Sequence, residues 1–109
     1  MDNSTELNEL KDLVKRFCEE RNWNQFHNPK DLAIGMSTEA NELLDLFLFK
    51  SDEEVKQMVN TPEKRAAIGS QLADILFFVL RFAQMNNFDL SDELARKMEK
   101  NKERYPVNK

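Results

Sequence analysis

The sequence has little of what many folds and active sites are built from. Its 109 residues include only two glycines, three prolines, one cysteine and one histidine. So few glycines and prolines leave little turn chemistry for a many-stranded sheet, and long helices fit better. The two glycines stand apart, which excludes a glycine-rich phosphate-binding loop. The lone histidine, His27, excludes a histidine-containing di-iron centre on bundle helices and gives no serine or cysteine nucleophile a base at a defined place.

The charge balance limits the possible binding partners, and the cysteine count indicates the cellular compartment. Sixteen basic and twenty acidic residues give a net charge of −4, so we expect no nucleic-acid polymer as partner. Cys18 lies on an apolar stripe and is expected to be a core thiol. A lone thiol and a polar N-terminus without a signal-peptide run favour the cytoplasm. The longest apolar stretch, residues 72–83, is too short to span a membrane, so no membrane partner is expected.

Hydrophobic periodicity and capping signals predict five helices. We expect them at about residues 5–21, 29–49, 52–59, 62–85 and 92–104. Asn28 and Thr61 each precede a proline, the typical N-cap before a first helical position, and Ser51 and Ser91 are the other predicted N-caps. Residues 22–28 are predicted to form a loop. The sequence therefore predicts a single all-α domain over residues 1–109, a helical bundle of about five helices.

The fourth predicted helix is apolar nearly all round. One group of apolar side chains and one group of aromatic side chains occupy different sides of it: Leu72, Ile75, Leu76, Val79 and Leu80, and Phe77, Phe78 and Phe82. A single small bundle rarely covers a helix from every side. The pattern therefore predicts that copies of the chain associate into an oligomer.

Four side chains on two predicted helices form the candidate catalytic and metal site. Glu39 and Glu42 are three residues apart, so they lie on one helix face and can meet on one cation. Gln71 and Asp74 repeat this spacing, and a carboxylate in such an apolar run is expected to be paired, hydrogen-bonded or metal-bound. If the two helices pack antiparallel, the pairs meet, and their oxygen atoms suit Mg²⁺ or Mn²⁺. Such glutamate pairs also occur on solvated faces, and spacing alone leaves both interpretations open.

Three motifs in order resemble the MazG-like all-α nucleoside triphosphate pyrophosphohydrolases, and among them the dCTP pyrophosphatase branch. They are the aromatic loop (residues 23–29), E-x-x-E at 39–42 followed by Q-x-x-D at 71–74, and K-M-x-x-N-x-x-R-Y-P at 97–106. The resemblance covers about residues 7–106. It implies a tetramer that uses Mg²⁺ to hydrolyse a nucleoside triphosphate, such as dCTP, between its α and β phosphorus atoms. The products would be the monophosphate and pyrophosphate.

The resemblance also implies roles for individual residues. Glu39, Glu42 and Asp74 are the implied catalytic metal ligands, and Gln71 occupies the fourth ligand position. The implied nucleotide contacts are Trp23, Phe26, His27, Lys97, Lys100, Asn101 and Tyr105. Each contact has a structural alternative, since the aromatic side chains could close the end of the bundle and the lysines could be solvated.

Gln71 is the departure from the family pattern, which has glutamate at this position. Glutamine offers a metal one oxygen without the charge, so three carboxylates should hold Mg²⁺ less tightly than four. Three interpretations therefore stay open. The chain is a pyrophosphohydrolase that sanitises the nucleotide pool, a catalytically weak nucleotide-binding protein on the same fold, or a helical interaction module with surface acids. Gln71 favours the second, and Asp74 and the aromatic loop disfavour the third.

Overall fold

The computed structural model describes residues 1–107, and in this range it contains helices and no strand. The helices are α1 (Leu7–Glu20), the short 3₁₀ helix η1 (Trp23–Phe26), α2 (Pro29–Asp45), α3 (Asp52–Asn60), α4 (Pro62–Asn86) and α5 (Leu90–Arg104). The predicted all-α class with five α-helices is confirmed. The last two residues of the single domain predicted over 1–109 lie outside the described residues.

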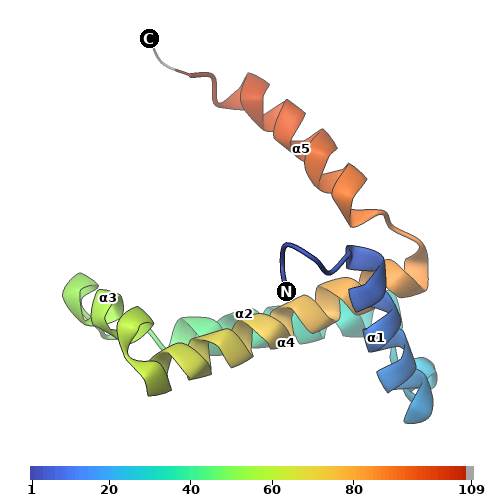
Figure 1. Ribbon diagram of the computed structural model, residues 1–109, viewed down its shortest axis with the longest axis horizontal. Coiled ribbons are helices and arrows are strands. Elements are labelled where there is room, and N and C mark those ends of the chain that lie inside the picture. The colour runs from blue at the N-terminus through green and yellow to red at the C-terminus, as the bar shows by residue number, and fades with distance from the viewer. Residues whose placement is uncertain (108–109) are drawn as a thin grey trace.

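Helix α4 is the central element of the fold (Figure 1). It lies alongside α2, and it also packs against α1 near its C-terminal end and against α3 near its N-terminal end. Asn87 ends α4 in the left-handed conformation, with φ at 60°. Beyond this residue α5 turns away from the other helices and projects from them, as Figure 1 shows. The C-terminal helix is therefore largely uncovered within one chain.

Two helix starts follow the predicted local chemistry. Asn28 caps α2, since its side-chain oxygen accepts a hydrogen bond from the Asp31 backbone at 2.8 Å, and Pro29 is the first helical residue. Ser51 caps α3 in a capping box, in which Glu54 reaches back to the Ser51 backbone N–H at 3.1 Å. Each signal acts over three residues, which is why the sequence alone could place it.

One helix end and two N-caps differ from the prediction. Helix α2 ends at Asp45 rather than near residue 49, and Phe49 adopts a left-handed backbone with φ at 63° that no α-helix can contain. Asp89, not Ser91, caps α5, because the Asp89 carboxylate accepts from the Asp92 backbone at 2.9 Å. Helix α4 begins at Pro62 as predicted. The Thr61 hydroxyl, however, donates back to a carbonyl of α3 and caps nothing.

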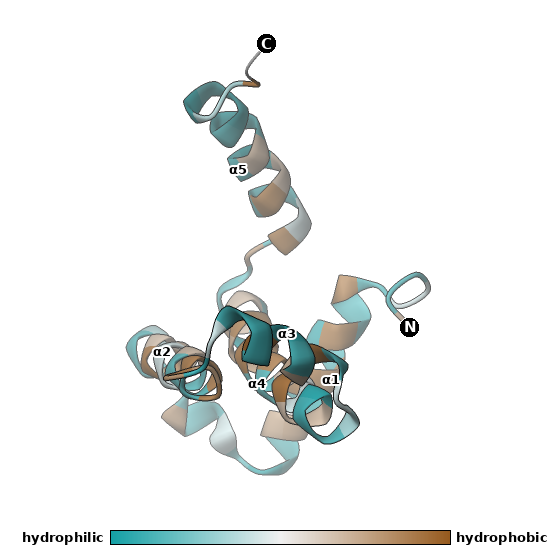
Figure 2. Cartoon of the chain, turned by 90° about the vertical axis from the view of Figure 1, so that its left-hand side faces the viewer, coloured by the Kyte–Doolittle hydropathy of each residue, from teal (hydrophilic) through white to brown (hydrophobic). Residues whose placement is uncertain are grey.

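The buried core within one chain is small. Val14, Cys18 and Leu80 form its centre, and Leu32 and Ala83 are the other buried apolar side chains. The complete burial of Cys18 confirms the predicted core thiol. Large apolar side chains of α1 and α4 stay more than one-third exposed, among them Leu7, Leu13, Phe17, Leu72 and Leu76. In Figure 2 hydrophobic segments accordingly recur along α1, α4 and the first part of α5.

The chain is also more open than a compact protein of its length. Its radius of gyration is 16.8 Å, whereas a compact chain of this length has about 13 Å. Its accessible surface is 8779 Å², whereas a folded monomer of this mass exposes about 6,300 Å². One chain alone therefore leaves an excess of roughly 2,500 Å² of surface uncovered.

Among residues 1–107, α4 is the one helix whose length and hydropathy would suffice to cross a membrane. The apolar stretch is extended on both sides into a helix of 25 residues, longer than the run visible in the sequence. The central helix of a soluble helical protein has the same properties. Here α4 packs against three other helices and carries Asp74 and the buried Arg81.

Candidate functional site

The site begins where α2 and α4 come together. A β-carbon at Gly35 would overlap the Phe78 ring, so glycine lets this ring lie against the backbone of α2. One turn further along α2, Nε2 of Gln71 donates to the backbone carbonyl of Glu39 at 3.0 Å and also to the Glu39 carboxylate. Gly35 thus contacts Phe78, whereas Glu39, later on α2, contacts Gln71, which lies earlier on α4. The two helices run antiparallel and bring the two predicted polar pairs to one place.

The two glutamates of this cluster share one site. The pKa of Glu42 is raised above its ordinary value because its carboxyl group shares a hydrogen bond with Glu39 and is repelled by the Glu39 charge. Asp74 adds a weaker repulsion, and the amide of Gln71 opposes the shift. The repulsion between two such carboxylates is reduced when one of them takes up a proton or when both bind a cation.

The side chains have the right chemistry for Mg²⁺ but do not form a closed cage. Among residues 1–107, no three aspartate, glutamate, histidine or cysteine side chains lie close enough to hold a metal ion. Mg²⁺ usually keeps several waters and binds through one or two carboxylates together with substrate phosphates. Glu39, Glu42 and the amide oxygen of Gln71 therefore fit an ion that arrives with a phosphorylated ligand.

Asp74 does not occupy the buried environment that its apolar neighbours predict. It is exposed, and no hydrogen bond or ion pair holds it within residues 1–107. The reason is that the apolar run around it is itself uncovered, with Leu72 and Leu76 53% and 43% exposed. Asp74 lies at the edge of the cluster, where its charge still acts on Glu42.

The aromatic loop has an inner part and an outer part. Trp23 is half-buried and packs edge-on against Phe17 at 5.4 Å and against His27 at 6.0 Å between ring centroids. This packing matches the structural alternative for Trp23, which closes the end of the α1–α4 contact. Phe26 is 61% exposed and is available to a ligand. His27 is half-buried, and its Nδ1 accepts a hydrogen bond from Arg81 at 3.0 Å.

The family model named MazG-like matches residues 34–109 of the chain. The chain belongs to the MazG-like family. It is 36% identical to dCTP pyrophosphatase 1 of Mus musculus and 34% identical to that of Homo sapiens, each over 102 residues. These alignments cover 94% of the chain but only 60% of each relative, so the chain spans less than two-thirds of their length.

A solved structure agrees with this assignment. The crystal structure of a pyrophosphatase from Archaeoglobus fulgidus matches the MazG-like chain with a TM-score of 0.86 and 30% identity, over 93% of both chains. The resemblance inferred from the motifs is thereby confirmed at the level of family and fold. The family match includes the acidic cluster and the C-terminal motif, while the aromatic loop lies before it.

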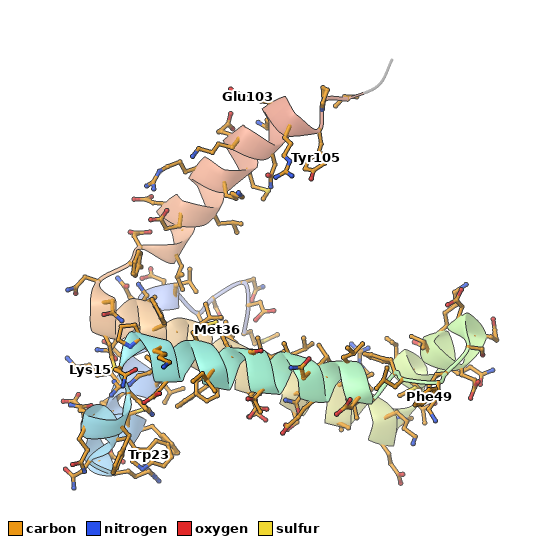
Figure 3. The ribbon with its side chains drawn as sticks, turned by 180° about the vertical axis from the view of Figure 1, so that it is seen from behind. Lys15, Trp23, Met36, Phe49, Glu103 and Tyr105 are labelled. Atoms are coloured by element: carbon orange, nitrogen blue, oxygen red, sulfur yellow. The ribbon has the colours of Figure 1, made fainter. Side chains whose placement is uncertain are left out.

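In this MazG-like chain the C-terminal motif lies apart from the acidic cluster. The predicted contacts Lys97, Lys100, Asn101 and Tyr105 all belong to the α5 end of the molecule. Figure 3 shows Tyr105 at the far end of α5, well away from α2 and its Met36. Both lysines are exposed, and Tyr105 is 67% exposed. One copy of the chain thus does not bring the two groups of predicted site residues together.

Two residues that the sequence analysis did not single out stand out in the MazG-like structure. Arg81 is 1% exposed and bonded to the aromatic loop. Its place in an apolar run was the available signal, but its partners lie more than fifty residues away along the chain. Phe49 is fully exposed in a left-handed conformation at the end of α2 (Figure 3). A bulky side chain held in this way is a strained feature that often accompanies function.

Proposed function

We propose that this MazG-like protein hydrolyses a nucleoside triphosphate to the monophosphate and pyrophosphate with Mg²⁺ as cofactor. The observation that carries the proposal is the convergence of Glu39, Glu42 and Gln71 on facing sides of α2 and α4. The printed names of its relatives, dCTP pyrophosphatase 1 and pyrophosphatase, support this reaction class. They also make dCTP the first substrate to test, in a role that sanitises the cytoplasmic nucleotide pool.

The two glutamates have distinct environments and so distinct roles. Bound Mg²⁺ would neutralise triphosphate oxygens and lower the pKa of a water molecule. Glu39 is half-buried and fixed by Gln71, which suits an orienting ligand. Glu42 is exposed and has a raised pKa, which makes its carboxylate the better acceptor for the proton that the attacking water loses. Asp74, at the rim, adds negative charge for the same cation.

We further propose that the working form is a homo-oligomer, with the tetramer implied by the family as the expected size. The excess surface of roughly 2,500 Å² per chain is of the size that obligate interfaces bury. An apolar hollow of about 210 Å³, lined by residues that include Met36, Phe82 and Leu90, lies open between α2, α4 and the start of α5. In an assembly, α5 of one copy would bring Lys100, Asn101 and Tyr105 toward the acidic cluster of another.

A second candidate function is nucleotide binding with little turnover. The observation that favours it is the amide of Gln71, which stands where the family pattern has a fourth carboxylate. This amide donates a hydrogen bond to the Glu39 carboxylate. Such a protein would bind a nucleotide with its Mg²⁺ and release it unchanged. Binding without pyrophosphate formation would select this alternative.

The test is a panel of nucleoside triphosphates incubated with Mg²⁺ and assayed for pyrophosphate. We expect pyrophosphate and the monophosphate only when Mg²⁺ is present, and no product in excess chelator. Glu42→Gln should abolish turnover, whereas Glu53→Gln, an exposed glutamate of α3, should leave it unchanged. Turnover that survives both the chelator and Glu42→Gln would reject the assigned site.

A further inference from the structure

Arg81 is a buried cation whose partners are all neutral. Its side chain is 1% exposed, and it donates to Nδ1 of His27 at 3.0 Å and to the side-chain oxygens of Gln84 and Asn24. The ion pairs formed within residues 1–107 do not include it. Burying a guanidinium without a carboxylate partner costs free energy, so ion pairing does not explain why Arg81 is buried.

Two of its three hydrogen bonds hold the aromatic loop. Asn24 and His27 precede Arg81 by 57 and 54 residues, and they flank the exposed Phe26. The guanidinium therefore ties the loop to the middle of the fold on both sides of Phe26. A loop held at two points by one rigid planar group keeps a fixed orientation relative to α4.

The same contact fixes the protonation state of His27. A guanidinium only donates hydrogen bonds, so Nδ1 must accept, and the neutral imidazole carries its proton on Nε2. Double protonation would break this bond and place a second positive charge beside Arg81. Burial, and then the Arg81 charge, lower the pKa of His27 accordingly. The Arg81 charge also acts on the thiol of Cys18 on α1, and the charge of Arg21, the residue after α1, acts on Cys18 as well.

Nε2 of His27 is open to a ligand. Among the described residues it has no hydrogen-bond partner, and no buried side-chain nitrogen or oxygen is left unpartnered there. Nε2 must therefore reach the surface of the half-buried ring. The result is a single N–H donor of fixed position beside the exposed Phe26.

We propose that Arg81 is a positioning residue, which holds His27 as a neutral imidazole whose Nε2–H donates a hydrogen bond to a ring carbonyl of the bound base. Cytosine, uracil, thymine and guanine offer such a carbonyl, and adenine does not. The identity of the ligand rests on the proposed function. The protonation state of His27 does not rest on it, so the inference about His27 and the proposed function can be rejected independently.

The first experiment measures His27 in the intact protein without a ligand. Because the chain has one histidine, ¹⁵N-histidine labelling gives resonances that need no assignment. We expect the Nε2-protonated tautomer at neutral pH and a pKa lowered from that of an unperturbed histidine. A predominant Nδ1-protonated form, or a pKa that is not lowered, would overturn the inference, and this measurement requires no variant.

Variants then test whether Arg81 is the cause. Arg81→Met should give mixed tautomers and a higher His27 pKa, and Arg81→Lys, which keeps a donor and the charge, should restore the Nε2-protonated form. Arg16→Met is the matched control, because this exposed arginine bonds only a backbone carbonyl of its own helix. An unchanged tautomer and pKa in folded Arg81→Met would contradict the assignment.

The last arm adds a non-hydrolysable dCTP analogue with Mg²⁺. Saturation should shift the Nε2–H resonance of the unaltered protein and of Arg81→Lys. In Arg81→Met the tautomers mix and the loop loses both of its anchors, so the hydrogen bond to the base should be lost. We expect KM for dCTP to rise roughly tenfold, the size of one hydrogen bond, with kcat within about twofold. A resonance that does not move on saturation would reject the recognition role while pyrophosphate release stands. Failure of the analogue to bind would reject both proposals, yet the ligand-free tautomer would still stand.

Discussion

A glutamate in place of Gln71 (Gln71→Glu) is expected to weaken the metal-free protein and to strengthen its hold on Mg²⁺. The Gln71 amide now donates to the backbone carbonyl and to the carboxylate of Glu39. A carboxylate donates neither bond and adds a like charge beside Glu39. One neutral and one charge-assisted hydrogen bond together contribute about 2–3 kcal/mol. Without metal, the Tm should therefore fall on the order of 10 °C.

With Mg²⁺ bound, Gln71→Glu is expected to stabilise the protein rather than destabilise it. Unit charges 4 Å apart attract by about 1 kcal/mol in bulk water and by about 4 kcal/mol near a protein surface. The cation is divalent, so even the value for water gives about 2 kcal/mol, which is more than a tenfold gain in affinity. Half-buried Gln71 lies between these limits, and the gain should be at least tenfold. The rate at limiting Mg²⁺ should rise with it.

The assay is a pair of Mg²⁺ titrations on both proteins, one of the Tm and one of the rate of pyrophosphate release. The curves of Tm against Mg²⁺ should cross, with Gln71→Glu lower at zero Mg²⁺ and gaining more at saturation. Gln57→Glu, an exposed position of α3, is the control and should shift neither curve. Identical curves for Gln71→Glu would place residue 71 outside the metal shell and refute the assignment of the second motif.

Four further changes test separate parts of the site. Phe26→Ala should raise KM for dCTP five- to a hundredfold, because base stacking is worth about 1–3 kcal/mol, and an unaltered KM would remove Phe26 from the site. Because the pKa of Glu42 is raised, the stability of the metal-free protein falls as pH rises through that pKa. Glu42→Gln should therefore raise the Tm at pH 7 without Mg²⁺ and make the Tm less dependent on pH. A lower Tm would contradict the repulsion between the carboxylates. Gly35→Leu should force the Phe78 ring out of contact with α2, cost about 1–3 kcal/mol in denaturant unfolding and lower kcat, and wild-type stability and rate would contradict the close approach. Light scattering at micromolar concentration should show an oligomer, and a stable monomer would leave the exposed faces of α1 and α4 unexplained.

Features that depend on a few neighbouring residues could be predicted from the sequence. The N-caps at Asn28 and Ser51 are of this kind, since donor and acceptor are three residues apart. The polar pairs Glu39/Glu42 and Gln71/Asp74 could also be placed on their helices, because the i, i+3 spacing fixes a helix face. Only the antiparallel packing had to be supplied by the fold.

Features that depend on distant residues or on other chains could not be predicted. Arg81 reads as an isolated charge in an apolar run, and its burial depends on Asn24 and His27 far earlier in the chain. The exposure of Asp74 has the opposite cause, since its apolar neighbours have nothing to cover them within one chain. Periodicity shows that a face is apolar, but not which surface covers it.

The most direct test of the central proposal identifies the bond that is broken. The protein is incubated with dCTP and Mg²⁺ and the reaction is followed by ³¹P NMR, which distinguishes pyrophosphate from inorganic phosphate and dCMP from dCDP. Attack between the α and β phosphorus atoms predicts dCMP and pyrophosphate in equal amounts, and no signal change in excess chelator. The appearance of dCDP and inorganic phosphate, or of the same products without divalent cation, would contradict the account.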